Sequence, residues 1–515
     1  MRRSVLSIGV LLLLSSIALA GSIDYQGTGG NLNVAGNWYE ISDINNPASH
    51  TGVTRVPTLG DLAYIRNATA GTINSAMSMI QLHVGAPAIT GTATQAMTTL
   101  NIAAGSNISL IRRLGEDIED AGLFVGGSYP GTLNMGGGTV DISGLASTRM
   151  WVGASVNPYT IGGQSVGTGV ANITGGTITL QDAGSELLVG GFANSTGTMN
   201  LSGGSVVVKH NAGPDRSIRV GVRSGLGVVN LSGTGYLSNA ALTEVGSSPL
   251  GGTSKATINQ TGGTLQFGYR MIVGEDDGLG HYRLMGGTLQ ADGGLWLGRF
   301  KTLEPAPGTV KGKGKLTLSQ NAVIKTALDG HLIMGLSTNN EAKSADHTVL
   351  ELKLGSAADF NATFNFVDLA GGLEVSLTNG YAPAPGTDWK LFGCATSAAA
   401  AFTTITPGFH TEVRGTDLYL VAGTIRHSGD ANNDGRVNVG DLGILAGKWG
   451  QTDFFGKSWD TGDFNGDDVV NVGDLGILAG AWGWVGTPAG ATNVPEPATL
   501  ALLVLGGLAM LRRRR

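Results

Sequence analysis

The string GTMNLSGGSV, residues 197–206, decides the fold of the middle of this chain, because neighbouring segments repeat it. Its copies are GTLNMGGGTV at 131–140, GVANITGGTI at 169–178, GVVNLSGTGY at 227–236 and ATINQTGGTL at 256–265. Each copy alternates apolar with polar or small residues, as a half-buried strand does, and then reaches a glycine-rich corner. The string therefore predicts a repeat protein built from short β-strands.

A second pattern lies between these copies, where an apolar residue is followed by glycine at a predicted strand end. It occurs at Val84-Gly85, Val125-Gly126, Val152-Gly153, Val189-Gly190, Val220-Gly221, Val245-Gly246, Val273-Gly274, Leu297-Gly298 and Met334-Gly335, with spacings of 24 to 41 residues. One coil of a parallel β-helix needs about this length, and glycine supplies the positive φ of its corners. A β-sandwich is the alternative, which the three-strand unit and the lack of Asn-Gly hairpin turns disfavour.

The predicted fold class is mainly β. A parallel β-helix over residues 65–355, similar to an autotransporter-type solenoid, follows an N-terminal cap at 21–64 and precedes a β-rich cap at 356–424. Inside the coils we expect Val228, Leu231, Ile258 and Leu265 to stack as an interior ladder. No single coil buries its own apolar side, so the solenoid must be continuous.

Two acidic loops near the C-terminus share one spacing and both end in NVGDLGILAG, residues 438–447 and 471–480. Calcium binds about six to eight oxygens, which a twelve-residue loop supplies from places 1, 3, 5, 7, 9 and 12. Place 7 gives a backbone carbonyl and the others give side-chain oxygens. The predicted ligands are Asp430, Asn432, Asp434, Arg436, Asn438 and Asp441 in the first loop, and Asp463, Asn465, Asp467, Val469, Asn471 and Asp474 in the second.

The sixth place distinguishes the two loops. Gly435 permits the sharp turn in the first loop, whereas Asp468 in the second must accept an unfavourable backbone or twist the loop. We therefore expect a weaker second Ca²⁺ site. The alternative is a pair of Asn/Asp/Gly-rich turns that bind no metal.

After each loop, Leu442, Leu445 and Trp449, then Leu475, Leu478 and Trp482, recur at the spacing of one helical face. Two such loop-helix units resemble a type I dockerin, over residues 427–485. The resemblance implies a cohesin-domain partner and a place in polysaccharide-binding or polysaccharide-degrading assemblies. The loops start 33 residues apart, which is longer than in the usual tandem.

Both ends of the chain carry targeting signals. Two arginines, an apolar run and the small residues before Ala20 indicate a signal peptide at 1–20, cleaved between Ala20 and Gly21. After a spacer at 486–493, the order Pro495-Glu496-Pro497, short apolar helix and four arginines resembles the PEP-CTERM sorting tail, residues 494–515. That tail implies processing by an exosortase-like enzyme and a transient membrane anchor at the cell envelope. An ordinary C-terminal membrane anchor is the alternative.

The net charge limits the classes of partner that we expect, and the cysteine content limits the possible disulfides. The chain has a formal charge of −6, which becomes about −12 without the six terminal arginines, so nucleic acid is not an expected partner. The single cysteine, Cys394, excludes an internal disulfide and is expected to be a buried small residue.

A polysaccharide lyase or glycoside hydrolase acting on the β-helix is the rival function. Paired carboxylates could serve it at Glu116, Asp117, Glu119 and Asp120, or at Glu275, Asp276 and Asp277 near His281. Both groups lie between glycine-rich segments, where solvated loops are expected, and the residue strings of polygalacturonases are absent. No catalytic residue is predicted.

Overall fold

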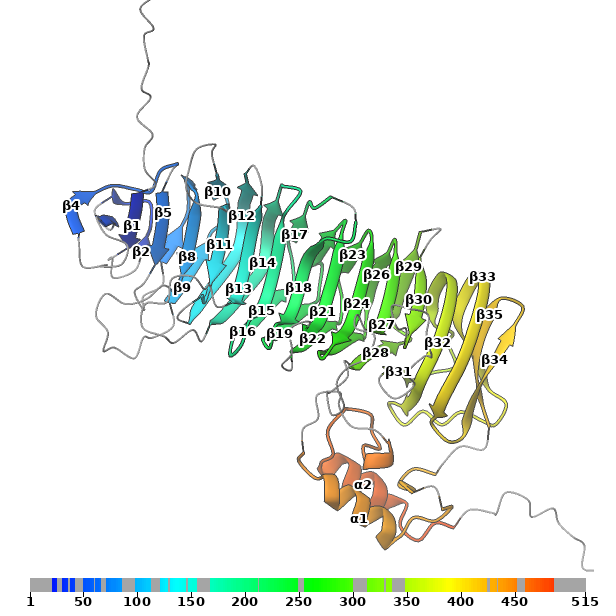
Figure 1. The fold of residues 1–515 in the computed structure, drawn as a ribbon. Helices are drawn as coiled ribbons and strands as arrows, with labels where there is room; N and C mark the ends of the chain where they lie inside the picture. The colour runs from blue at the N-terminus through cyan, green and yellow to red at the C-terminus, as the bar shows by residue number, and fades with distance from the viewer. Residues whose placement is uncertain are drawn as a thin grey trace, which may run out of the picture. The chain divides into compact units, whose positions relative to one another are not determined.

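The protein forms two compact units, Met1–Thr424 and Ile425–Arg515 (Figure 1). The computed structural model describes residues 21–25, 30–35, 38–41, 50–59, 61–65, 71–85, 98–112, 121–127, 130–144, 147–154, 167–211, 213–248, 254–299, 313–327, 330–335, 348–423, 427–432, 434–451 and 459–485. The first unit is almost entirely β-structure, and the second holds the two α-helices of the described chain.

The first unit is a parallel β-solenoid with three faces, and most of its coils contribute a separate strand to each face. The first face contains β2 (Gly30–Asn31), β6 (Gly71–Ile73), β9 (Thr98–Ile102), β12 (Gly131–Ser143), β14 (Thr168–Leu180), β16 (Thr196–Leu201), β19 (Leu226–Leu231), β22 (Lys255–Gln260), β25 (Leu279–Leu284), β28 (Lys313–Ser319), β31 (Thr348–Leu354) and β32 (Asn361–Leu377).

The second face contains β7 (Ala76–Met79), β10 (Asn107–Ile111), β17 (Ser205–Val208), β20 (Tyr236–Asn239), β23 (Thr264–Phe267), β26 (Gly287–Ala291) and β29 (Ala322–Thr326), joined by the far ends of β12 and β14. The third contains β1 (Gly21–Tyr25), β5 (Asp61–Ile65), β8 (Gln81–Val84), β11 (Ala121–Val125), β13 (Thr148–Ala154), β15 (Glu186–Gly191), β18 (Arg216–Val222), β21 (Leu242–Ser248), β24 (Arg270–Asp276), β27 (Gly294–Arg299) and β30 (His331–Met334). The predicted parallel solenoid is therefore confirmed.

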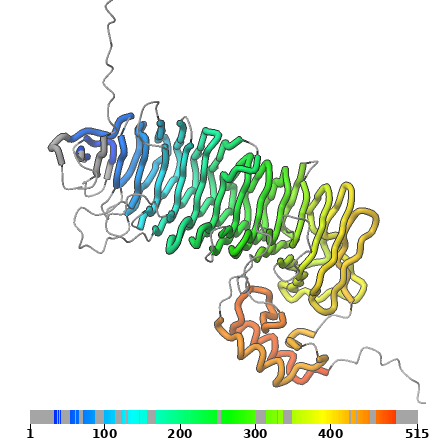
Figure 2. Tube along the Cα trace, in the orientation of Figure 1, coloured from blue at the N-terminus to red at the C-terminus, as the bar shows by residue number. Residues whose placement is uncertain are grey.

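The coils stack on one another (Figure 2), and their strands pair with the sequence copies in register. Strand β16 pairs with β14 on one side and β19 on the other, so that Asn200 lies between Asn172 and Asn230. The fourth residue of every quoted copy is asparagine, and these side chains form a continuous amide ladder. Each Nδ2 donates to the Oδ1 of the preceding coil at 2.7–3.0 Å, through Asn259, Asn230, Asn200, Asn172, Asn134 and Asn101.

Strand alternation separates this outer ladder from the core. In β16, Met199 and Leu201 are buried inside the coil, while Thr198 and Asn200 are half-buried on its outer side. Leu231, Ile258 and Leu265 lie in the interior as predicted. Val228 does not, because Val229 and Leu231 share the inner side and Val228 has the opposite parity.

Glycine corners separate the third face from the first. Gly190 is the last but one residue of β15 and has a φ of 67°, and a Cβ added there would lie 1.8 Å from the carbonyl oxygen of Leu226 in the next coil. This position requires glycine for two reasons: its backbone is left-handed, and a strand of the next coil approaches it closely.

Antiparallel strands close both ends of the first unit. At the start, β1 pairs in parallel with β5 but antiparallel with β3 (Trp38–Ile41), which in turn pairs with β4 (His50–Thr54). At the far end, β33 (Asp388–Ile405) pairs in parallel with β32 and antiparallel with β35 (Asp417–Ala422), beside β34 (Phe409–Arg414). Parallel pairing therefore reaches into both segments predicted as caps.

The second unit contains α1 (Val439–Lys448), the short 3₁₀ helix η3 (Trp459–Thr461) and α2 (Val472–Gly480). Within the described part of the chain, no helix has the length and apolar character needed to cross a membrane. The predicted signal peptide with Ala20, and the tail with Pro495, Glu496 and Pro497, lie outside the described residues, whereas Gly21 begins β1.

Candidate calcium site

The first acidic loop curls around two buried carboxylates. Asp430 accepts the backbone N–H groups of Asp434 at 3.2 Å and Gly435 at 3.0 Å. Asp441, in the first turn of α1, accepts those of Ala431 at 2.8 Å and Asn438 at 2.8 Å. Burial raises the pKa of Asp430 despite the N–H bond from Gly435, and the charge of Asp441 adds to this rise. A cation between these groups would relieve that repulsion.

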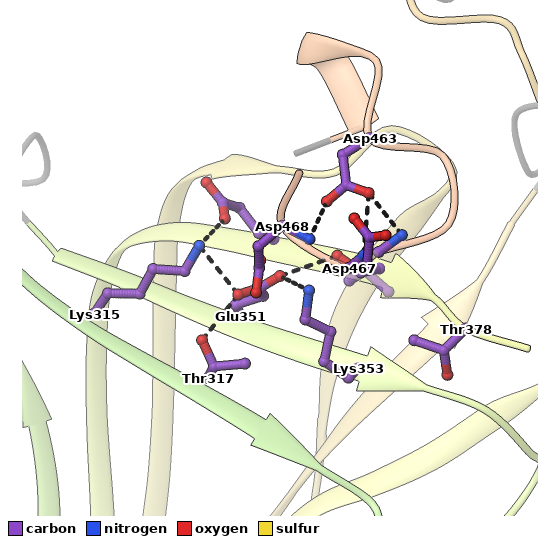
Figure 3. Close-up of polar contacts among 12 residues, drawn as sticks. Lys315, Thr317, Glu351, Lys353, Thr378, Asp463, Asp467 and Asp468 are labelled. Atoms are coloured by element: carbon purple, nitrogen blue, oxygen red, sulfur yellow. Dashed lines mark hydrogen bonds and ion pairs between the residues drawn. The ribbon is translucent and has the colours of Figure 1, made fainter. Parts of the chain in front are cut away.

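The second loop repeats this arrangement residue for residue. Asp463 accepts the N–H groups of Asp467 at 3.2 Å and Asp468 at 2.9 Å, and Asp474 accepts those of Phe464 at 2.7 Å and Asn471 at 2.9 Å. Figure 3 labels Asp463, Asp467 and Asp468. Carboxylate oxygens of Asp463, Asp467 and Asp474 all lie within 4.8 Å of one another, the only such group of three acids or metal-binding side chains in the described ranges.

Place 6 has left-handed backbone in both loops. The φ angle is 79° at Gly435 and 71° at Asp468. Of the two outcomes considered for Asp468, the structure shows the unfavourable backbone rather than a twisted loop. An L-residue other than glycine pays a conformational penalty there, of order 1 kcal/mol.

Places 3, 7 and 9 also have defined local roles. Asn432 Oδ1 accepts the N–H of Asp434, and Asn465 Oδ1 accepts that of Asp467. The N–H groups of Arg436 and Val469 donate to the place-5 carboxylates of Asp434 and Asp467, each at 2.9 Å.

At place 9, Asn438 and Asn471 cap the helices by accepting the N–H groups of Gly440 and Gly473. Hydrogen bonds thus link the predicted side-chain ligands within each loop, with the place-9 side chains turned to their helix termini. Among the described residues of the two loops, only those of the second hold three carboxylate oxygens within 4.8 Å of one another.

The two loop-helix halves pack against each other reciprocally. The carbonyl of Val437 accepts the N–H of Gly483 after α2, and the equivalent carbonyl of Val470 accepts that of Gly450 after α1. A Cβ on Gly429 would lie 3.2 Å from the Cα of Leu478. The equivalent Cβ on Gly462 would lie 2.9 Å from the Cα of Leu445. Each half therefore completes the other.

Only part of the predicted apolar helix face is buried. Leu445 and Leu478 belong to one core with Ala431, Val437, Trp459, Phe464 and Val470. Trp449 and Trp482 are 45% and 52% exposed, contrary to their predicted place on that face. The reason is that α1 ends at Lys448 and α2 at Gly480, so neither tryptophan lies within a helix.

The acidic residues weighed for catalysis have other surroundings. Glu275 is buried on the third face, where it accepts from Ser247 at 3.0 Å and pairs with Arg299 at 3.4 Å. His281 is buried on the first face, with Nε2 2.8 Å from Thr317 Oγ1. Burial raises the pKa of Asp277, and the neighbouring Asp276 adds to it. Glu116, Asp117, Glu119 and Asp120 lie outside the described residues.

Sequence reasoning missed a buried ion cluster on the first face (Figure 3). Lys315 lies 3.0 Å from Glu351 and 2.9 Å from Glu374, and Lys353 lies 2.6 Å from Glu351. Burial disfavours the charge on Glu351, but the attraction of Lys315 and Lys353 outweighs it and lowers the pKa of Glu351. The alternating charges of β31 were the available signal, because alternate residues share one side of a strand.

Comparison with known proteins identifies one segment. Residues 493–515 match the PEP-CTERM protein-sorting motif. This motif indicates an exported protein with a C-terminal anchor for sorting to the cell surface and implies processing by an exosortase-like enzyme. No curated protein and no solved structure matches the chain.

Proposed function

We propose that this exported β-solenoid is displayed at the cell surface and that its C-terminal module binds two Ca²⁺ ions to dock onto a cohesin-domain protein. The observation that carries the proposal is the repetition of one carboxylate arrangement in two loops that pack reciprocally. Three acids in each loop repel one another without a cation, and oxygen-only ligands at this spacing suit calcium.

The helices give docking a physical link to calcium. Val439 and Val472, at place 10 of their loops, are 73% and 74% exposed, and the exposed Trp449 and Trp482 follow the helices. These apolar side chains occur in equivalent pairs on both halves. Calcium would fix the loops from which both helices start, and hence the surface offered to a partner. The dockerin resemblance makes that partner a cohesin domain, in an assembly that binds or degrades polysaccharide.

Calorimetric titration of the exported protein with Ca²⁺ tests the proposal. Two binding events are expected, with Asp430→Ala removing one and Asp463→Ala removing the other. Asp460→Ala is the matched control, since Asp460 belongs to η3 and to neither loop. The strained backbone of Asp468 predicts that the Asp430 loop is the tighter one. Absence of binding heat, or unchanged heats in both loop variants, would leave the acids as metal-free turns.

Docking is tested separately with immobilised cohesin domains. Binding should require Ca²⁺ and should be lost in the Asp430→Ala, Asp463→Ala double variant. Calcium binding without any cohesin binding would retain the metal sites and refute the docking role. Intact-mass measurement of the surface protein tests the tail, because processing after Pro495-Glu496-Pro497 removes Arg512 to Arg515.

A further inference from the structure

One arginine on the third face of the solenoid has no acidic partner among the residues that the structure describes. Neighbouring arginines on this face are paired: Arg219 lies 2.9 Å from Glu186 and 3.1 Å from Glu244, and Arg299 lies 3.4 Å from Glu275. Arg270, on β24, makes no ion pair or hydrogen bond with any described side chain. Burial and the positive charge of Arg299 lower the pKa of Arg270, which Tyr269 only partly offsets. No carboxylate in the described ranges therefore compensates its charge.

Two aromatic rings stack against the guanidinium group of Arg270. The Cζ atom of Arg270 lies 3.8 Å from the ring centre of Trp296 and 4.7 Å from that of Tyr269. All three side chains are half-buried, so the group reaches the surface. A guanidinium directs its five N–H donors outward in its own plane. Stacking occupies its faces and leaves those donors available to a ligand.

Because Gly294 has no side chain, the Trp296 ring has room beside it. Along this face, Arg270 is followed in the next coils by Gly294, His331 and Phe366. A Cβ on Gly294 would lie 2.3 Å from His331 Nε2 and 2.7 Å from Trp296 Nε1. Trp296 Nε1 instead donates to His331 Nε2 at 2.9 Å, and His331 stacks on Phe366 with ring centres 4.9 Å apart. The ring that supports Arg270 is thus fixed in orientation.

We propose that Arg270, Tyr269 and Trp296 form a binding subsite for a uronic-acid unit of an acidic polysaccharide. The in-plane donors of Arg270 match the two oxygens of a carboxylate. The faces of Trp296 are turned to Arg270 and to Arg299, whose Cζ lies 5.2 Å from the same ring centre, so the half-buried ring edges of Trp296 and Tyr269 offer the apolar contact to a sugar ring. A guanidinium that no described acid pairs with gains most from such a ligand, because no described ion pair has to be broken. The site extends the proposed surface role to the solenoid and does not require the calcium module.

A polynucleotide also combines anions with rings that stack on aromatic side chains. Nucleic-acid affinity comes mainly from several Lys or Arg side chains that neutralise phosphates, whereas the neighbouring Arg219 and Arg299 are already paired with acids. A single uronic-acid carboxylate needs only the one guanidinium of Arg270. We therefore favour the saccharide.

Calorimetry of the exported protein with oligogalacturonates tests the proposal, with calcium held constant. Tighter binding is expected for the acid form than for its methyl ester, which has the same sugar rings without the charge. Arg270→Gln should weaken binding about tenfold, the usual effect of removing a charge-assisted hydrogen bond. Trp296→Phe keeps a ring under the guanidinium and should retain most of the affinity.

The matched control is Arg414→Gln. Arg414 also lies over an aromatic ring, with Cζ 4.6 Å from the ring centre of Tyr419, but it is paired with Asp388 and Glu412. Its loss should leave binding unchanged. The Asp430→Ala, Asp463→Ala variant should also bind normally, which separates this site from the calcium module. Equal affinity for acid and ester, unchanged binding in a folded Arg270→Gln variant, or tighter Arg270-dependent binding of poly(dA) would overturn the assignment.

Discussion

Truncating one asparagine in the middle of the amide ladder should cost about twice as much as truncating the last one. Asn200 donates to Asn172 and accepts from Asn230, both at 2.7 Å, so Asn200→Ala removes two hydrogen bonds. Asn259 donates to Asn230 and takes part in no other hydrogen bond with a described side chain, so Asn259→Ala removes one. Each such bond contributes about 1 kcal/mol net. The expected losses are therefore about 2 and about 1 kcal/mol.

Native-state hydrogen exchange is the suitable assay, because a solenoid is stabilised locally by neighbouring coils and opens locally. The free energy of opening would be measured for β16 in the Asn200 variant and for β22 in the Asn259 variant. Thr198→Ala is the control, since Thr198 is half-buried on the same side of β16. Its cost should stay below about 0.5 kcal/mol. Equal costs at Asn200 and Asn259 would show that the amides act separately and not as a ladder.

Three further results are expected. Asp468→Gly should relieve the strain of the left-handed backbone at φ 71° and tighten calcium binding by the second loop. Asp468→Asn removes only the charge and should tighten calcium binding less. Equal calorimetric affinities for both variants would exclude backbone strain as the cause. Because the pKa of Glu351 is lowered in the folded protein, its ion cluster stabilises the fold above about pH 4, which is near the pKa of a glutamate in the unfolded chain. This stabilisation is lost as the pH falls further. Glu351→Gln should flatten this acid dependence of hydrogen exchange in β31, and an unchanged slope would contradict it. Burial, with a contribution from Asp417, raises the pKa of Cys394 to about 11, so a thiol reagent should label it at neutral pH only after unfolding; rapid labelling of the folded protein would disprove this.

The sequence predicted the solenoid best at positions where the backbone conformation strongly favours glycine. Gly190 and the equivalent corner glycines mark positions that need a positive φ, so the apolar-glycine pattern located the strand ends. Side-chain direction was harder to predict. Val228 and Leu231 are both apolar but three residues apart, and only the strand register shows that Val229 takes the inner place.

The candidate sites show the same division between local and long-range information. The spacing of acids from Asp430 to Asp441 is local, and the structure gathers those residues. The contact of Gly462 with Leu445 depends on how two halves pack, which no spacing reveals. Arg270 and Trp296 meet because adjacent coils stack, and coil lengths that vary from 24 to 41 residues prevent such pairs from being counted along the sequence.

The antiparallel strands at each end of the first unit have a consequence for self-association. A parallel coil that ends abruptly exposes unpaired N–H and C=O groups, on which the first coil of another molecule could continue the same sheet. Strand β35 reverses the pairing direction beyond the start of β33, and β3 does so beside β1. Along those stretches a second molecule would meet an antiparallel edge instead of a matching parallel one. There the end strands oppose the growth of head-to-tail fibres, which the high local concentration of a crowded cell surface would otherwise favour.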